Sequence, residues 1–297
     1  MVPVVDVLIP TYNRPAALAV TLACLIGQTF RDFSVTIADQ SEPEAVEHSG
    51  EVQAVISVLR AHGHAVSILR NLPRKGMAQQ RQFLLEQSTA PYVLFLDDDL
   101  ILEPYVIGSL VHAIREEACG LVGSALIGLT HVDDVRPHEQ AIAFWQGRVQ
   151  PETIRPDTPE WERYKLHNAA NILHVSRQMN LSASAPRRYK IAWVGGCVLY
   201  NVEKLRQAGE FAFWHDLPAA HAGEDVLAQL RVMEAFGGCG LIPSGVYHQQ
   251  IPTTIADRTV DAPRYLNIAP DSAYDVAGKP SSVMQHRGRN QQRKNQS

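Results

Sequence analysis

The sequence predicts an α/β protein with a mostly parallel, Rossmann-like central sheet flanked by helices. Three observations support this fold class. In the first hundred residues, short apolar runs typical of buried strands alternate with longer segments typical of helices. Such alternation favours parallel strands joined by right-handed crossovers. Polar residues follow several of the predicted strands, and one strand runs directly into three carboxylates, Asp97 to Asp99.

The elements of the first hundred residues follow in order. Asn13 and Pro15 favour a helix start after the first strand, because proline suits the first turn of a helix. Apolar residues at helical spacing mark the second helix, for example Val52, Ile56 and Leu59. The predicted strands are Val4–Pro10, Phe33–Asp39, Ala65–Asn71 and Tyr92–Asp97, and the predicted helices are Ala16–Gly27, Ala45–Ala61 and Gly76–Gln87.

The second half of the chain is less regular. Thr130–Pro186 is polar, rich in tryptophan, proline and histidine, and has no clear periodicity. From about Ala277 the chain is basic and polar, which predicts a disordered tail. The remaining predicted strands are Gly120–Leu129, Ile191–Tyr200 (interrupted at Gly195-Gly196) and Gly240–Tyr247, and the remaining helices are Val202–Ala208 and Glu224–Phe236.

The composition is that of an ordinary soluble enzyme. Of the 297 residues, 45% are hydrophobic, which is enough to form a core. The formal net charge of −4 argues against nucleic acid as the main partner. The four cysteines form no CxxC pair, so they indicate separate thiols rather than a disulfide frame or a zinc site. We recognise no signal peptide and no membrane-spanning run, and therefore expect a cytoplasmic protein.

The polar residues at the strand ends predict a binding site. Thr11, Asp39, Asn71 and Asp97 to Asp99 all lie at or just past the ends of successive strands. Because the carboxyl ends of parallel strands share one edge of a sheet, these groups should line one crevice. Clustered carboxylates repel one another and resist burial, so three acids after so apolar a strand favour a bound divalent cation.

Several short motifs, in a fixed order, carry a resemblance to a known family. They are Val5–Arg14 (VDVLIPTYNR), Asp39, Arg81, Phe95–Asp99 (FLDDD), Gly223–Asp225 (GED) and Tyr247-His248. With these motifs the chain resembles the family 2 glycosyltransferases over roughly residues 4–129 and 191–250. The resemblance implies a GT-A type fold with a variable acceptor-side region. It also implies transfer of a sugar from a nucleotide diphosphate donor.

The resemblance also implies how the donor is held. The first strand-to-helix turn would cradle the nucleotide, and Asp39 would accept a hydrogen bond from the uracil imide. The resemblance gives Trp193 as a possible stacking surface. From the residues themselves, the N-terminus of the helix that begins at Gly76 is a natural anion site, where Arg74 or Lys75 could approach the donor. From the residues alone, a plain helix-cap turn at Thr11 and a structural salt bridge at Arg81 remain open. The implied donor-binding residues are Pro10, Thr11, Tyr12, Asp39, Lys75, Arg81, Asp97, Asp98, Trp193, Gly195 and Gly196.

The metal and the catalytic residues follow from the same resemblance. Asp99 would coordinate Mn²⁺ or Mg²⁺, and His248 would complete the metal site or contact the diphosphate; an imidazole ligand would favour Mn²⁺. Asp225 would be the general base and Glu224 would bind the acceptor. From the residues alone, these two acids are also explained as favourable charges at a helix N-terminus. The implied reaction is a single displacement that inverts the anomeric configuration.

The sequence predicts the domain organisation and the binding partners only coarsely. We divide the chain into a nucleotide-sugar-binding half (1–129), a variable insert or lid (130–190), an acceptor and catalytic half (191–276) and a disordered basic tail (277–297). UDP is the favoured nucleotide because of Asp39, with dTDP and GDP open. The acceptor is an unidentified glycan, lipid-linked molecule or small molecule, and the basic tail suggests peripheral membrane contact.

Three other functions compete with this interpretation. A nucleotidyltransferase would carry a glycine-rich first loop, which Thr11–Pro15 lacks. A metal phosphohydrolase would need a second carboxylate cluster, and none is convincing. A catalytically inactive glycosyltransferase-like protein that binds a nucleotide sugar or a partner is the main alternative, although the intact Asp99 and Asp225 argue against it.

Overall fold

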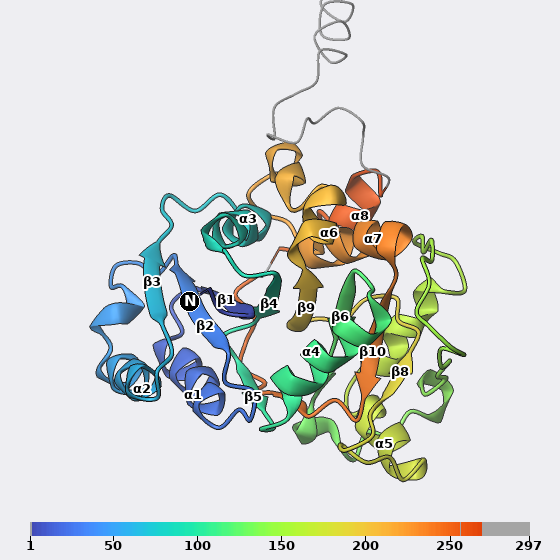
Figure 1. The fold of residues 1–297 in the computed structure, drawn as a ribbon. Helices are drawn as coiled ribbons and strands as arrows, with labels where there is room; N and C mark the ends of the chain where they lie inside the picture. Colours follow the sequence, from blue (N-terminus) through green and yellow to red (C-terminus); the bar gives the residue numbers. More distant parts are fainter. Residues whose placement is uncertain (1, 256, 269–297) are drawn as a thin grey trace, which may run out of the picture.

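A computed structural model describes residues 2–255 and 257–268, so the predicted tail at 277–297 and the end of the predicted acceptor half lie outside the described residues. The predicted fold class is confirmed: within the described residues the main sheet has eight strands. The first four in spatial order, at the left of Figure 1, run parallel to one another. In spatial order the strands are β3 (Val66–Arg70), β2 (Phe33–Asp39), β1 (Val5–Thr11), β4 (Tyr92–Leu96), β9 (Cys197–Asn201), β6 (Leu121–Gly123), β10 (Gly238–Ile242) and β8 (Arg187–Tyr189).

Helices cover both faces of this sheet, as Figure 1 shows. One face carries α1 (Pro15–Ile26), α2 (Gly50–Ala61) and α4 (Val106–Glu117). The other face carries α3 (Met77–Gln87), α6 (Val202–Gln207), α7 (Glu224–Phe236) and the short α8 (Ala262–Tyr265). Among the helices that the structure describes, none has both the length and the apolar character needed to cross a membrane.

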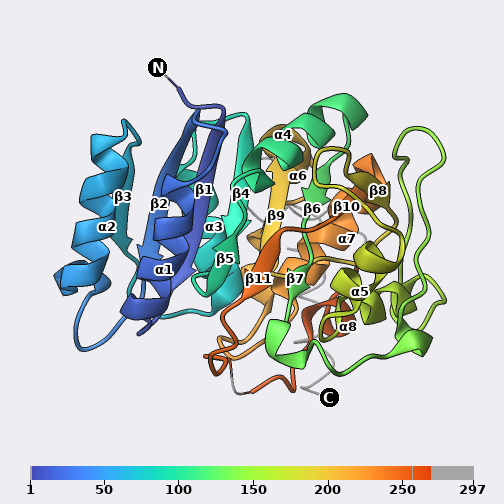
Figure 2. The ribbon, with the colours of Figure 1, turned by 90° about the horizontal axis from the view of Figure 1, so that it is seen from below.

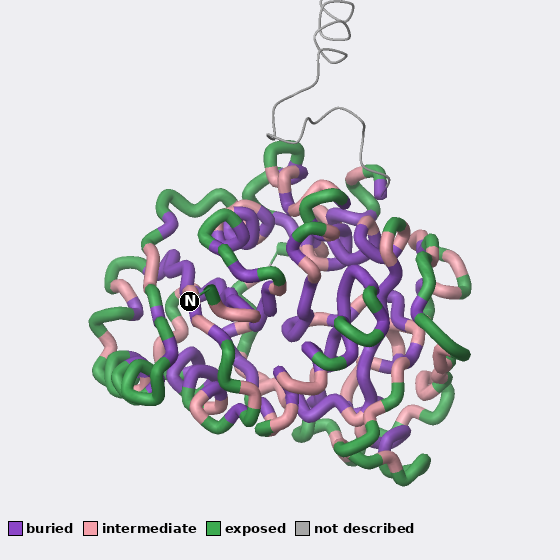
Figure 3. Tube along the Cα trace, in the orientation of Figure 1, coloured by how far each residue is buried: buried purple, intermediate pink, exposed green. Residues whose placement is uncertain are grey.

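Side-chain alternation along the strands creates two separate cores, one on each face. In β1, Val7 and Ile9 join the core under α1 and α2, whereas Leu8 joins the core under α3 and α7. In β4, Phe95 joins the core under α3 and α7, and Leu96 joins the core under α1 and α2. Figure 3 shows the central strands buried throughout, which explains why they read as continuous apolar runs in the sequence.

A second, three-stranded sheet corrects two of the predicted strands. Gly240–Tyr247 is not one strand: β10 ends at Ile242, and β11 (Val246–His248) belongs to the small sheet with β5 (Leu100–Leu102) and β7 (Leu126–Ile127) (Figure 2). The predicted strand Gly120–Leu129 likewise divides into β6 and β7. The turn before β11 needs Gly245, which has a φ of +71° and whose Cβ would lie 2.5 Å from the Tyr105 hydroxyl.

Two further boundaries differ from the predictions. Only Cys197–Asn201 of the predicted strand Ile191–Tyr200 is extended; it forms β9, antiparallel to both β4 and β6. Residues 191–196 form a loop instead. Helix α2 begins at Gly50 rather than at Ala45, because the Ser49 hydroxyl caps it by accepting a hydrogen bond from the Val52 N–H at 3.4 Å.

The segment between residues 130 and 190 packs against the core. It contains the 3-10 helix η4 (Trp161–His167), α5 (Asn171–Gln178) and strand β8, which pairs antiparallel with β10. Ile172 and Val175 of α5 belong to the core under α7. An Arg163–Glu152 pair with contacts of 2.7 and 3.0 Å ties the segment to itself. A lid function for it stays a prediction, which limited proteolysis with and without UDP and Mn²⁺ would test.

Candidate active site

The predicted strand-end residues converge at one edge of the main sheet. Thr11 ends β1 and lies opposite Asp39 at the end of β2. The Thr11 hydroxyl donates a hydrogen bond of 2.6 Å to Asp98 Oδ2, so the first turn contacts the acid run 87 residues later. The structure therefore brings these two segments together, as the sequence predicted; that they line a binding crevice stays a prediction.

Arg14 is a site residue that the sequence analysis missed. Its Nη1 donates to Asp99 Oδ2 at 2.8 Å and to Asp98 Oδ1 at 3.3 Å, and its Nη2 donates to the Pro252 carbonyl. Proline and asparagine in the same turn drew attention to helix capping, although a basic residue opposite an acid run was the available signal. Arg14 places a fixed positive charge against the two carboxylates.

The pKa values of the two carboxylates that Arg14 contacts are shifted in opposite directions. Burial raises the pKa of Asp98 to about 6, and the Asp99 charge adds to the effect while Thr11 and Arg14 oppose it. Burial also acts to raise the pKa of Asp99, but the His248 hydrogen bond and the charges of His248 and Arg14 outweigh it. The pKa of Asp99 is therefore lowered, and this carboxylate is ionised when Asp98 still binds a proton at mildly acidic pH.

The small sheet brings His248 to Asp99. Strand β11 pairs with β5, with His248 opposite Leu100, and His248 Nε2 lies 3.5 Å from Asp99 Oδ2. The hydrogen bond to Asp99 raises the pKa of His248. His248 Nδ1 accepts a 2.8 Å hydrogen bond from the Gln250 N–H, so the hydrogen of the neutral ring is on Nε2 and points to Asp99.

This donor set fits a divalent cation that is held largely by its substrate. In the described residues, no group of three or more His, Cys, Asp or Glu side chains is placed to hold a metal. Mg²⁺ is commonly bound by one or two carboxylates together with substrate phosphates, which is what Asp99 and a diphosphate offer. Coordination by His248 Nε2 requires the ring hydrogen to move to Nδ1, at the expense of the Gln250 hydrogen bond.

A buried arginine connects the acid run to the second acidic motif. Arg81 of α3 is 6% exposed; its Nε lies 3.0 Å from Glu224 Oε1, and its Nη2 lies 3.3 Å from Asp97 Oδ1. Burial alone would lower the pKa of Arg81, but the charges of Glu224, Asp97 and Asp225 raise it, so the guanidinium stays charged. The salt bridge considered for Arg81 exists, and it lies inside the crevice.

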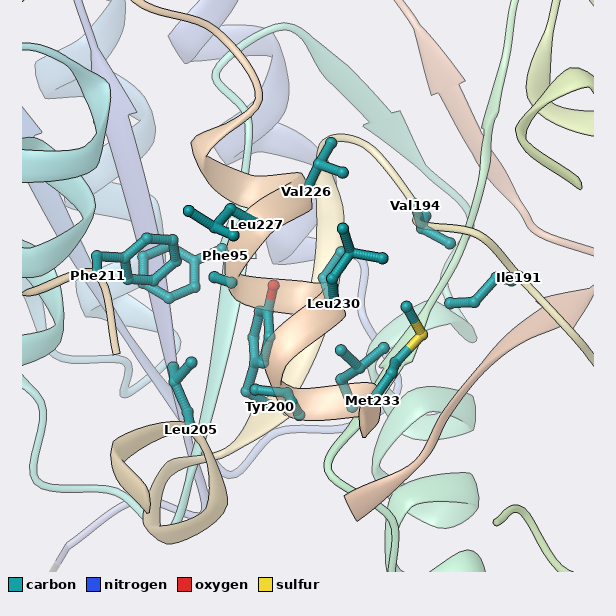
Figure 4. Packing of buried hydrophobic residues seen from close by; sticks show 14 of the residues in the cluster. Phe95, Ile191, Val194, Tyr200, Leu205, Phe211, Val226, Leu227, Leu230 and Met233 are labelled. Carbon is teal, nitrogen blue, oxygen red and sulfur yellow. The ribbon is translucent and has the colours of Figure 1, made fainter. Parts of the chain in front are cut away.

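Asp225, at the start of α7, lines a small pocket. Gly223 precedes the helix with a φ of +76°, a conformation that favours glycine. A Cβ at this position would also lie 2.5 Å from Asp261 Oδ1. The pocket has an apolar floor, which Figure 4 shows in part as Phe95, Tyr200 and Phe211 beside α7. It is lined by Arg81, Phe95, Gly196, Val198, Tyr200, Phe211, Asp225 and Gln229.

The environment of Asp225 suits a general base. Burial raises its pKa to about 7, the Glu224 charge adds to the increase, and Arg81 opposes it. A base whose pKa lies near neutral pH can both accept a proton and be regenerated. Glu224 is buried and its Oε1 accepts a hydrogen bond from Arg81 Nε, and the charge of the same arginine also acts on Asp225.

The Trp193–Gly196 loop lies between this pocket and the insert. The Trp193 ring stacks on Tyr164 at 5.0 Å between centroids and contacts Trp161 at 4.5 Å, so residues of the insert cover part of the predicted stacking surface. Gly196 has a φ of +72°, and its Cβ would lie 3.0 Å from Asp97 Oδ2. Gly195 has open space where a Cβ would be. The loop therefore brings backbone close to Asp97.

The remaining predicted donor residues already have protein partners. The Asp39 carboxylate is fully buried and accepts from the Ser41 N–H at 2.8 Å, from the Val46 N–H at 2.9 Å and from Arg70. Recognition of a base by Asp39 would require one of these partners to be exchanged. Pro10 is the buried residue before Thr11 in β1.

Tyr12 is partly buried and Lys75 is exposed. The Arg74 guanidinium lies 3.6 Å above the centre of the Tyr12 ring, whereas Lys75 is exposed, with its Nζ 5.6 Å from the centre of the Trp214 ring. The N-terminus of α3, considered as an anion site, is partly occupied because the Ala78 N–H donates to His221 Nε2 at 3.1 Å.

The fold is of the GT-A type. Residues 6–182 match the profile described as glycosyl transferase family 2. The chain belongs to this family.

Individual related proteins share limited sequence identity with this chain. The chain is 31% identical to the chondroitin synthase of Escherichia coli over 262 residues, which are 83% of this chain and 35% of the relative. It is 28% identical to an uncharacterized glycosyltransferase of Haemophilus influenzae over 111 residues, which are 37% of this chain and 34% of the relative. The chain thus spans about a third of the length of these relatives.

A solved structure resembles the fold. The crystal structure of TarS residues 1–349 from S. aureus superposes with a TM-score of 0.52 at 16% sequence identity, and the match covers 82% of this chain and 60% of that chain. This likeness supports the architecture of the sheet and its helices.

Proposed function

We propose that this protein is a metal-dependent, inverting glycosyltransferase that moves a sugar from a nucleotide diphosphate donor to a hydroxyl acceptor. The single observation that carries this proposal is the position of Asp225: a carboxylate with a pKa of about 7 lies beside the Arg81 guanidinium, which also contacts Asp97 of the acid run. The proposed proton acceptor is thus connected through Arg81 to the acid run that we propose binds the donor.

The proposed reaction is a single in-line displacement. Asp225 accepts the proton of the acceptor hydroxyl as its oxygen attacks the anomeric carbon, and the bond from that carbon to the diphosphate breaks on the opposite face. Asp99 would hold the divalent cation, which when bound would supply charge neutralisation for the leaving diphosphate. Arg81 keeps Asp97 and Glu224 paired, so that the charges around the donor sugar are fixed before the reaction begins.

The nature of the donor is the least direct part of the proposal. A UDP-sugar is favoured through the family resemblance of Asp39, and the matched TarS fragment has also been solved in a complex with UDP-GlcNAc. Residues 130–190 are the proposed acceptor-side region, because Trp161 and Tyr164 of this segment contact the Trp193–Gly196 loop.

A thermal-shift panel tests the proposal first. The protein is melted with UDP, GDP, dTDP or CDP, each with Mn²⁺, Mg²⁺ or EDTA. A nucleotide at about 100 times its Kd should stabilise the fold by about 2.7 kcal/mol, which is easily measured. We expect a shift that needs both metal and nucleotide and is absent in Asp99→Asn. No shift with any combination would overturn the donor-binding proposal and favour the inactive alternative.

A further inference from the structure

The Gln229 side chain joins α7 to the Trp193–Gly196 loop. Its Nε2 donates to the Val194 carbonyl and its Oε1 accepts from the Val194 N–H, both at 2.8 Å. Both residues are fully buried. Because a buried backbone group without a partner is unfavourable, one amide side chain here replaces the neighbouring strand that this loop residue lacks.

The loop has little freedom beyond this joint. The Gly196 carbonyl accepts from the Asp97 N–H at 2.8 Å, which fixes the end of the loop at the acid run. On the sheet side, Val194 packs so closely on Gly123 that a Cβ there would lie 2.8 Å from Val194 Cβ. Figure 4 shows Val194 beside the inner face of α7. Gln229 is therefore the polar connection between the loop and the helix that carries Asp225.

Asp225 and Gln229 are one helical turn apart. Residues separated by four positions lie on the same face of a helix, and both side chains line the small pocket together with Gly196 and Arg81. The first turn of α7 thus carries the proposed base, and the second turn carries the anchor of the loop that reaches Asp97. The spacing between base and loop is set by the rigid helix.

We propose that Gln229 is a positioning residue for sugar transfer, which holds the Trp193–Gly196 loop in register with Asp225. This inference rests on the proposed function. Fixing the loop aligns the anomeric carbon with the acceptor oxygen, and a misplacement of about 1 Å can lower a rate by about 100-fold. The nucleotide itself is expected at Thr11 and Asp98, away from this joint, so its binding should not depend on Gln229.

The chain offers a matched control in Gln28. Gln28 is also fully buried, and its amide donates to the Glu103 carbonyl at 3.0 Å and accepts from the Ile107 N–H at 3.1 Å. It joins the end of α1 to the start of α4, on the other face of the sheet. Its amide also donates to the Cys24 carbonyl at 3.3 Å. Gln28→Met therefore removes three contacts with backbone groups and Gln229→Met removes two, so Gln28→Met should affect folding at least as much.

The experiment compares three measurements in the full-length variants. Hydrogen exchange of the segment 192–197 should be at least about tenfold faster in Gln229→Met and unchanged in Gln28→Met. The kcat for hydrolysis of the nucleotide sugar that the wild type uses, beginning with UDP-GlcNAc, in which water takes the sugar and the nucleoside diphosphate leaves, should fall about 100-fold in Gln229→Met only. The Kd for UDP with Mn²⁺ should stay within about twofold in both variants. Gln229→Asn, which is one methylene too short, gives the same comparison if the methionine variant does not fold.

The outcomes separate the two proposals. Unchanged exchange in the loop, or a kcat for Gln229→Met within about twofold of the Gln28→Met value, would overturn the positioning role. A wild type that releases no nucleotide from any sugar nucleotide would overturn the proposed function instead, and loop exchange would then decide whether Gln229 anchors the loop.

Discussion

The Nε atom of Arg81 lies 3.0 Å from the Oε1 atom of Glu224, although 143 residues separate them in the chain. This contact joins α3 to α7 and, through the second contact of Arg81 with Asp97, connects both helices to the end of β4. The ion pair thereby assembles the crevice from the two halves of the chain. Both partners are almost completely buried, so neither charge has an alternative partner in water.

Removing Arg81 should therefore destabilise the protein strongly. Arg81→Met leaves the Glu224 carboxylate buried without its partner, and breaking a buried pair in this way costs about 3–5 kcal/mol. The matched control is Arg264→Met, which breaks a bidentate but exposed pair with Asp157 and should cost far less, because solvent-exposed ion pairs contribute little to stability. Urea unfolding measures both; equal, small losses would mean that the Arg81 pair has no structural importance.

The pH dependence of turnover should report Asp225. A base must be deprotonated to act, and the pKa of Asp225 is raised to about 7. We expect kcat/KM to rise with pH and to level off above this value. Asp225→Asn should lower turnover by about 100- to 10,000-fold, the usual contribution of a general base. The control Asp157→Asn should leave the profile unchanged, and normal turnover in Asp225→Asn would show that another group is the base.

The same group should also influence stability. The folded-state pKa of Asp225 is raised well above its ordinary value of 3.8. The folded state therefore binds more protons than the unfolded state between about pH 4 and pH 7, and stability falls as pH rises through that window. Asp225→Asn removes this loss, so its Tm relative to the wild type should be higher at pH 8 than at pH 4. Thermal melts at both pH values test this, and a difference in Tm that is independent of pH would argue against the raised pKa.

Removing Arg14 should strengthen the binding of a metal ion in the absence of donor. Its guanidinium lies 2.8 Å from Asp99 and competes with a cation for the same carboxylate oxygen. We expect Arg14→Met to bind Mn²⁺ about tenfold more tightly, which corresponds to about 1.4 kcal/mol. Electron paramagnetic resonance of free Mn²⁺ measures this.

The control for Arg14 is Arg31→Met. Arg31 is exposed between α1 and β2, at the opposite end of the strands, and its removal changes the net charge equally. Asp99→Asn should abolish the Mn²⁺ binding that Arg14→Met is expected to strengthen. Mn²⁺ binding that is unchanged or weaker in Arg14→Met would mean that Arg14 does not compete with the metal.

Local sequence patterns predicted the bounds of several strands and helices. Strand β2 and helix α7 have the bounds that the sequence predicted, because a buried strand is a continuous apolar run and a helix with one buried face has a 3.6-residue period. The division of Gly240–Tyr247 into β10 and β11 was not predictable in this way. Both parts are apolar, and only the packing of Tyr105 against Gly245 shows why the chain turns between them.

The sequence by itself determined the class of the fold and the residue types of the site. The alternation of strands and helices required a parallel sheet, and the strand ends required Thr11 and the acid run to share an edge. Only the tertiary structure decided which charges meet. Arg14 contacts acids 84 and 85 residues away, and Gln229 holds Val194 across 35 residues. Such contacts depend on how helices pack on the sheet, and a side chain leaves no periodic signal of its distant partner.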